Sequence, residues 1–169
     1  MRATLVAVAL VFGMASSSHA QCRTVPLGIS EQEFIRGYER RMAPTGAGEV
    51  AFFSVSSGQR MYMHLTPGGP RGQTHVISVD APDNMVRQVS FFLRDNASEA
   101  LAERIRIGVA HVVSRAGGLT DQEGKNAVDR AFRRVSGARA TRTERAGEAA
   151  ITIDRENGLV MISVGRVRC

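Results

Sequence analysis

The spacing of apolar positions first indicates a helix. Ser30 followed by Glu33 forms a capping box, which satisfies the free backbone N–H groups where a helix begins. Apolar residues then recur three or four positions apart, at Phe34, Ile35, Tyr38 and Met42. The pattern predicts an amphipathic helix over residues 31–42, which Pro44 ends.

Four runs with strand-like alternation follow. They cover residues 49–56, 60–66, 74–80 and 86–94. The connectors between them contain Pro, Gly, Asp and Asn, which favour the turns of an antiparallel meander. In the second run the alternation groups Met61, Met63 and Leu65, and we expect these side chains to face the core.

The apolar period then changes back to that of helices. Leu101, Ile105, Val109 and Val112 share one face, and Gly117 or Gly118 supplies the left-handed residue that ends a helix. A capping box at Thr120 and Glu123 opens a further helix that runs to about Val135. The short link between the two helices predicts a helical hairpin.

The last part of the chain returns to strands. Residues 149–154 and 159–167 are joined by a turn at Asn157-Gly158, a strong hairpin signal. Residues 138–145 alternate Thr with Arg and suit a solvated edge strand. The expected fold is a single α+β domain. It holds a mainly antiparallel sheet of about six or seven strands, an N-terminal helix and a helical hairpin inserted before the C-terminal strands.

Residues 1–20 have the pattern of a secretory signal peptide. Arg2 precedes an apolar segment, and Ser18-His19-Ala20 fits a small-x-small cleavage site. No later stretch is apolar enough to predict a membrane span. A lipid anchor on Cys22 is disfavoured because Gln21 is not small. Residues 21–169 are therefore expected to be an exported domain, periplasmic or extracellular, from a bacterium.

The two cysteines lie at opposite ends of this expected domain. Export into an oxidising compartment favours a disulfide, and two cysteines permit one intramolecular pairing, Cys22 with Cys169. The alternatives are free thiols or an intermolecular bond. The intramolecular bond would require the segment before the first helix to run beside the end of the strand at 159–167.

The charge of the chain is basic, with a formal net charge of +6. It comes from 21 arginines and a single lysine, Lys125, and acidic residues are interspersed among them. The chain has no Trp and two Tyr, so it lacks the aromatic platforms on which single-stranded nucleic acids stack. We therefore expect no nucleic-acid partner and interpret the arginines mainly as a solvated surface.

His64 and His75 flank the loop at 66–73 and could be imagined as two metal ligands. If the strands pair with matched core faces, Met63 opposes Ile77 and the two histidines point to opposite faces. We prefer this register to the one shifted by a residue, which would place His64 opposite His75. No Cys or carboxylate completes a metal site in the sequence, so we expect no metal and no cofactor.

A stripe of polar residues follows the flank of the first hairpin helix. Arg104, Gly108, His111 and Arg115 recur at helical spacing. The stripe could be an anion- or carboxylate-binding groove, with Gly108 allowing close approach. The alternative is a boundary stripe, where arginine stems cover the core edge and Gly108 accommodates a packed neighbour.

Two classes of function remain open. No Gly-x-Ser-x-Gly elbow or dinucleotide-binding motif is present, so the preferred function is a non-enzymatic, inhibitor-like or accessory module that binds a protein. Its candidate binding residues are Arg104, His111, Arg115 and Arg71, the last in the Pro- and Gly-rich loop at 66–73. The alternative is a small secreted hydrolase-like enzyme built around His111 or His64. We expect a monomer or a weak homo-oligomer that associates through 138–145.

Overall fold

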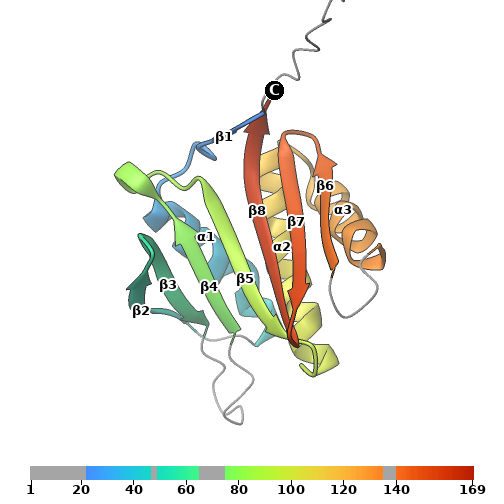
Figure 1. The fold of residues 1–169 in the computed structure, drawn as a ribbon. Coiled ribbons are helices and arrows are strands. Elements are labelled where there is room, and N and C mark those ends of the chain that lie inside the picture. Colours follow the sequence, from blue (N-terminus) through green and yellow to red (C-terminus); the bar gives the residue numbers. More distant parts are fainter. Residues whose placement is uncertain (1–21, 47–48, 65–74, 135–139) are drawn as a thin grey trace, which may run out of the picture.

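One antiparallel sheet organises the chain, and Figure 1 is viewed onto the face that no helix covers. The computed structural model describes residues 22–46, 49–64, 75–134 and 140–169. The strands follow the spatial order β2-β3-β4-β5-β8-β7-β6, and β1 pairs with the end of β8. Their bounds are β1 Arg23–Val25, β2 Val50–Ser56, β3 Gln59–His64, β4 His75–Asp80, β5 Gln88–Arg94, β6 Ala140–Ala146, β7 Ala149–Glu156 and β8 Leu159–Arg168.

Three helices lie on the other face of this sheet (Figure 1). They are α1 Glu31–Met42, α2 Glu99–Gly117 and α3 Asp121–Arg133. The two capping boxes are present at Ser30 and Thr120, and the Ser98 side chain caps α2. The predicted α+β class, single domain, N-terminal helix and helical hairpin are confirmed. In the described part of the chain, no helix is long and apolar enough to cross a membrane.

The hydrophobic core lies between the sheet and the helices. Alternate residues of the central strands are fully buried there, as in Val89 and Phe91 of β5 and Ile162 and Val164 of β8. α2 runs over β5, β8 and β7, and its apolar stripe contributes Ile105, Val109, Val112 and Ala116 to the core. The helical spacing of these residues therefore predicted the buried face of α2 correctly.

The pairing of β3 with β4 corrects the predicted register. His64 lies opposite His75 and Tyr62 opposite Ile77, so Tyr62 and His64 point toward the helices and Met61 and Met63 do not. The prediction was wrong because strand alternation offers both faces equally, and methionine was ranked above Tyr and His for burial. Helix α1 makes Tyr62 and His64 acceptable in the core, because Glu31 accepts a hydrogen bond from Tyr62 and the Tyr38 ring packs against His64.

The face without helices carries a row of small hydroxyl residues across the central strands. Ser78, Ser90, Ser163, Thr152 and Thr143 lie opposite one another in register from β4 to β6. The Ser90 and Ser163 hydroxyls are 2.8 Å apart, and those of Thr143 and Thr152 are 3.1 Å apart. These cross-strand hydrogen bonds stabilise the pairing on the side of the sheet that has no helix layer.

The Cys22–Cys169 disulfide joins the two ends of the described chain. β1 pairs antiparallel with β8, with Arg23 opposite Arg168, so the segment before α1 does run beside the end of the last strand as predicted. The guanidinium of Arg145 donates hydrogen bonds to both sulfurs, at 2.9 Å to Cys169 Sγ and 2.7 Å to Cys22 Sγ. β1 itself was not predicted, because three residues are too short to show alternation.

The helix layer depends on a close contact between α1 and α2. A Cβ atom added at Gly108 would lie 2.6 Å from Tyr38 Oη and 2.8 Å from Tyr38 Cε2. Tyr38 is fully buried and stacks at a tilt on Phe91, with ring centroids 6.0 Å apart. The predicted close approach at Gly108 is therefore a packing contact between two helices.

Removing the disulfide should destabilise the domain strongly. Replacing Cys22 and Cys169 by serine releases a loop that encloses nearly all of residues 21–169, and the free energy of unfolding should fall by about 3–5 kcal/mol. Urea unfolding of both forms measures the difference. Reduced wild type should match the double variant, and alkylation of two thiols in the unreduced protein would contradict the assignment.

Gly108→Ala should lower the free energy of unfolding by about 1–3 kcal/mol, because the new methyl group overlaps Tyr38. Gly37→Ala, in the middle of α1, is the matched control. Its Cβ would meet His111 Nε2 at 3.7 Å, an ordinary contact. The control should therefore be neutral or stabilising by up to about 1 kcal/mol, through helix propensity. Equal effects of the two changes on thermal unfolding would contradict the packing assigned to Tyr38.

Candidate functional site

An open cleft lies where α1 meets the α2–α3 hairpin. It has a volume of about 710 Å³. Its lining residues are Gly37, Arg40 and Arg41 of α1, His111, Ser114 and Arg115 of α2, and Gly118, Leu119, Thr120 and Asp121 at the turn and start of α3. The cleft is formed by side chains at helical spacing on α1 and α2, so each helix presents one face to it.

The charges around the cleft are mostly positive. Arg40 and Arg41 come from α1, while Arg115 comes from the last turn of α2. Of the described residues that line the cleft, Asp121 is the one acidic residue, and its carboxylate lies 3.1 Å from Arg41 Nη2. Arg40 donates a hydrogen bond to the Arg36 carbonyl oxygen in its own helix, at 3.3 Å. The guanidinium groups therefore outnumber the carboxylates that could neutralise them.

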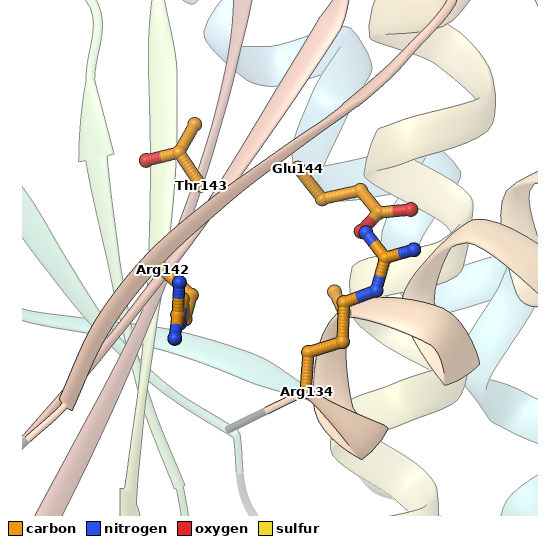
Figure 2. A pocket seen from close by; sticks show the side chains of 5 residues that line it. Arg134, Arg142, Thr143 and Glu144 are labelled. Atoms are coloured by element: carbon orange, nitrogen blue, oxygen red, sulfur yellow. The ribbon is translucent and has the colours of Figure 1, made fainter. Parts of the chain in front are cut away.

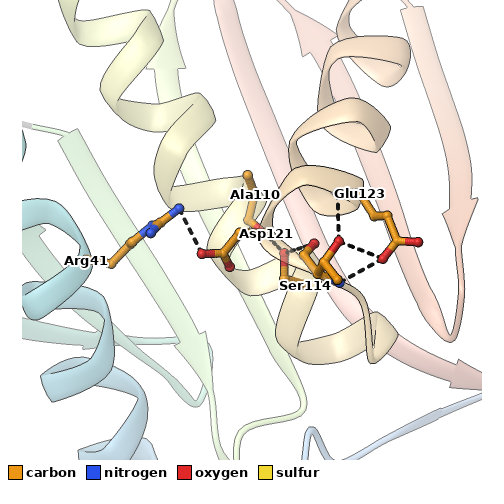
Figure 3. A network of polar contacts seen from close by, with 6 residues as sticks. Arg41, Ala110, Ser114, Asp121 and Glu123 are labelled. Atoms are coloured by element: carbon orange, nitrogen blue, oxygen red, sulfur yellow. Dashed lines mark hydrogen bonds and ion pairs between the residues drawn. The ribbon is translucent and has the colours of Figure 1, made fainter.

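A polar network fixes the floor of the cleft, as Figure 3 shows. The Ser114 hydroxyl donates to the Ala110 carbonyl oxygen at 2.9 Å and lies 3.1 Å from the Thr120 carbonyl oxygen. The Thr120 hydroxyl donates to the Glu123 carboxylate at 2.8 Å, and the Glu123 backbone N–H donates to that hydroxyl at 3.3 Å. These contacts hold the start of α3 against the end of α2, so the side of the cleft formed by these two helices is fixed.

His111 is the titratable group at the centre of this cleft. Burial lowers its pKa below the ordinary value, and the nearby charges of Arg115 and Arg41 lower it further, against an opposing effect of Asp121. The imidazole is therefore neutral at pH 7. An anion placed between His111 and the two arginines would offset the effects of burial and of the arginines on the pKa of His111, and would favour the protonated ring.

The predicted stripe on α2 divides between two environments. His111 and Arg115 lie in the cleft, whereas Gly108 is covered by Tyr38. Arg104 lies close enough to His75 for its charge to lower the pKa of that imidazole. Arg71, in the loop at 66–73, lies outside the described residues.

The contribution of α1 to the cleft was not predicted from the sequence. Arg40 and Arg41 line the cleft, yet they were interpreted as part of a solvated surface. Their position one turn beyond Gly37 on the same helical face was the available signal. It was weak, because polar helix faces are usually solvent-exposed. Only the crossing of α1 over α2 places these arginines opposite His111.

The histidines that flank the loop at 66–73 belong to a buried cluster with Tyr38. His64 and His75 are 1% and 4% exposed, and their ring centroids are 5.0 Å apart. Tyr38 Oη lies 3.0 Å from His75 Nε2. Burial lowers the pKa of His75 to about 3 and raises that of Tyr38, so the Tyr38 hydroxyl donates and neutral His75 accepts. This arrangement stabilises the core rather than exposing a base to a substrate.

A second polar group sits at the start of α1. Glu31 is 4% exposed, and its carboxylate accepts a hydrogen bond from the Tyr62 hydroxyl. Arg60 Nη1 lies 3.3 Å from the other carboxylate oxygen. Burial, together with this hydrogen bond, raises the pKa of Tyr62 to about 12. Glu31 is therefore engaged by two partners from β3.

A smaller pocket of about 290 Å³ lies between the end of α3 and β6. Figure 2 shows Arg134 and Glu144 pointing toward one another across it, and their ion pair measures 2.8 Å. Arg130 Nε also lies 3.0 Å from Glu144. Because Glu144 already engages two arginines, this pocket offers less uncompensated charge than the cleft beside His111.

In the described part of the chain, no three His, Cys, Asp or Glu side chains are grouped so that they could hold a metal ion. The chain matches no protein-family model, and no curated protein or solved structure matches it. Function is therefore inferred from the geometry of this chain alone.

Titration of His75 should make stability depend on pH. Its pKa in the folded protein, about 3, lies below the reference value of 6.5, so the unfolded chain takes up the proton first as the pH falls. The stability from neutral His75 is therefore complete above pH 6.5 and is lost between pH 6.5 and 3. Urea unfolding should show a loss of about 2 kcal/mol between about pH 7 and pH 5.

His75→Gln is the control for this measurement, because glutamine does not titrate and can still accept a hydrogen bond from Tyr38. Its stability should fall by about 2 kcal/mol less than that of the wild type over the same interval, and the remaining loss includes the contribution of His111, whose pKa burial also lowers. An equal pH slope in the variant and the wild type would contradict the buried neutral state of His75.

Proposed function

We propose that the protein is an exported, non-enzymatic binding module, and that the cleft between α1 and the α2–α3 hairpin takes up an acidic segment of a protein partner. The observation that carries this proposal is the convergence of Arg40, Arg41 and Arg115 around His111, with Asp121 as the one acidic lining residue among those described. Arginine is suited to this task because its planar guanidinium binds carboxylates through two parallel hydrogen bonds.

The shape of the cleft favours an extended peptide. It is open to solvent along the groove between the helices, and two of its walls are rigid because the Ser114 and Thr120 networks fix them. A preorganised groove loses little entropy when it binds a flexible chain.

Export is supported by two features of the chain. Residues 1–20 have the pattern of a secretory signal peptide. The Cys22–Cys169 bond is of the kind that persists in oxidising compartments such as the periplasm or the extracellular medium. A binding module that acts there gains from a covalent link between its first and last strands, since the link limits unfolding.

The enzymatic alternative has weaker support. A hydrolase built on His64 would need an accessible base, yet that ring is almost completely buried. His111 is more accessible, and Ser114 lies one turn away, but the Ser114 hydroxyl donates to a backbone carbonyl oxygen. A nucleophile must instead share its proton with a base.

Binding of an acidic peptide tests the proposed function directly. We expect a glutamate-rich peptide to bind the mature protein, as measured by isothermal titration calorimetry or fluorescence anisotropy. Arg115→Gln should weaken binding by about tenfold through loss of a charge-assisted contact, and Arg40→Gln should act similarly. Arg87→Gln removes an equal charge from an exposed residue outside the cleft and is the matched control.

The same titration carried out at several pH values tests the role of His111. Bound carboxylates favour its protonated form, so binding takes up a proton and affinity rises as the pH falls from neutral to below 6.5, the ordinary value from which the pKa of His111 is lowered. His111→Gln should flatten this dependence, whereas Arg115→Gln should weaken binding at every pH. If Arg87→Gln and Arg115→Gln weaken peptide binding equally, the net charge of the protein alone attracts the peptide. That result would contradict the proposed site.

A further inference from the structure

Strand β2 ends the sheet with an edge that is unusually apolar. In the described residues, β3 is its only strand neighbour, so its outer edge has no strand partner there. Its sequence, Val-Ala-Phe-Phe-Ser-Val-Ser over Val50–Ser56, contains no charged residue and no proline. Edge strands are commonly protected by such residues, because their unpaired N–H and C=O groups can add another strand.

Exposed side chains mark the same strand. Phe52 is 55% exposed, Phe53 48% and Val55 61%. Among the described residues, the other large hydrophobic side chain that is comparably exposed is Leu159, at 43%, in β8. Three of these four residues therefore gather on one seven-residue edge. Clustered apolar exposure of this kind indicates an interaction surface rather than chance variation.

The opposite edge of the sheet contrasts with β2. Strand β6 carries Arg142, Glu144 and Arg145, and charged side chains on an edge strand commonly discourage the addition of another strand. Glu144 is also held by arginines of α3, so β6 is tied to its own helix layer. Self-association through 138–145, the edge expected from the sequence, is thus less favoured than association through the other edge.

We infer that the outer edge of β2 pairs antiparallel with β2 of a second copy, which makes a two-fold symmetric dimer with one continuous sheet. Antiparallel pairing centred on Phe53 brings Phe53 against its symmetry mate and sets Ala51 opposite Val55. No charged residue of β2 is buried or brought against a like charge, because the strand has none. A single self-complementary patch of this kind closes after two copies.

The size of the patch sets the strength of the dimer. With roughly 200 Å² for a fully exposed Phe and somewhat less for Val, the three side chains offer about 300 Å² of apolar surface per chain. Stable interfaces bury about 800 Å² per partner, so the dimer should be weak, with a dissociation constant in the micromolar range or above. A β-bulge at Phe53 interrupts the ladder with β3 but leaves all seven residues in the strand.

Sedimentation equilibrium of the mature protein over about a hundredfold range of concentration tests this inference. We expect the weight-average mass to rise from that of a monomer toward that of a dimer. Val55→Lys should weaken association at least tenfold, because each lysine would place a charge opposite Ala51 of the other copy in an otherwise apolar pairing. Val55 is largely exposed, so the variant should keep its fold and its thermal unfolding temperature. Phe53→Lys is the second variant, and Leu159→Lys is the matched control that should still dimerise.

Amide hydrogen exchange locates the interface. Protection of residues 50–56 should rise with concentration in the wild type and not in Val55→Lys, while that of 140–146 stays constant. A monomer at all concentrations, concentration-dependent protection of 140–146, or equal weakening by Leu159→Lys would each overturn the inference. If residues 50–56 become protected in a monomer, and only after an extended foreign peptide is added, the edge binds a strand of another protein. That result would likewise overturn the inference. Acidic-peptide binding at the cleft is measured separately, with the Arg115→Gln variant, so that failure of one proposal leaves the other open to its own test.

Discussion

The contact of Tyr38 with Gly108 is the constraint on which the helix layer depends. Gly108 has no side chain, so the Tyr38 ring occupies the space that a Cβ would fill. α1 can then cross α2 closely while Tyr38 reaches His75 in the sheet beneath. One residue thereby fixes α1 to its neighbouring helix and to β4. The cleft follows from this crossing, because it places Gly37 and the arginines beyond it against His111.

The core under α1 is unusual in being held partly by polar pairs. Tyr38 with His75 and Tyr62 with Glu31 bury aromatic rings together with their hydrogen-bonding groups. Such pairs are stable only when each polar atom finds its partner, so they tolerate fewer arrangements than aliphatic contacts do. They therefore fix the position of α1 along the sheet. The other half of the core, under α2, uses aliphatic residues of β5, β7 and β8.

The two edge strands of the sheet, β2 and β6, differ in charge and in their contacts. β6 is charged and tied to α3 through Glu144, while β1, β8 and the disulfide link the first and last described segments. β2 contains no charged residue, and no described strand pairs with its outer edge. The C-terminal half thus adds covalent and ionic links to its aliphatic core, whereas the meander half exposes an apolar edge. The cleft beside His111 and the apolar edge of β2 are formed by different elements of the fold.

The sequence alone predicted the three α-helices and strands β2 to β8, because helix caps, apolar periods and the Asn157-Gly158 turn are local signals. Its two cysteines permit one intramolecular pairing, Cys22 with Cys169, which the structure forms. Tertiary structure decided which face of β3 is buried, because the alternation of a strand is symmetric and α1 brings Glu31 to Tyr62 and Tyr38 to His64. It alone brought Arg40 and Arg41 to His111, because contacts between helices depend on packing angles that no local pattern encodes.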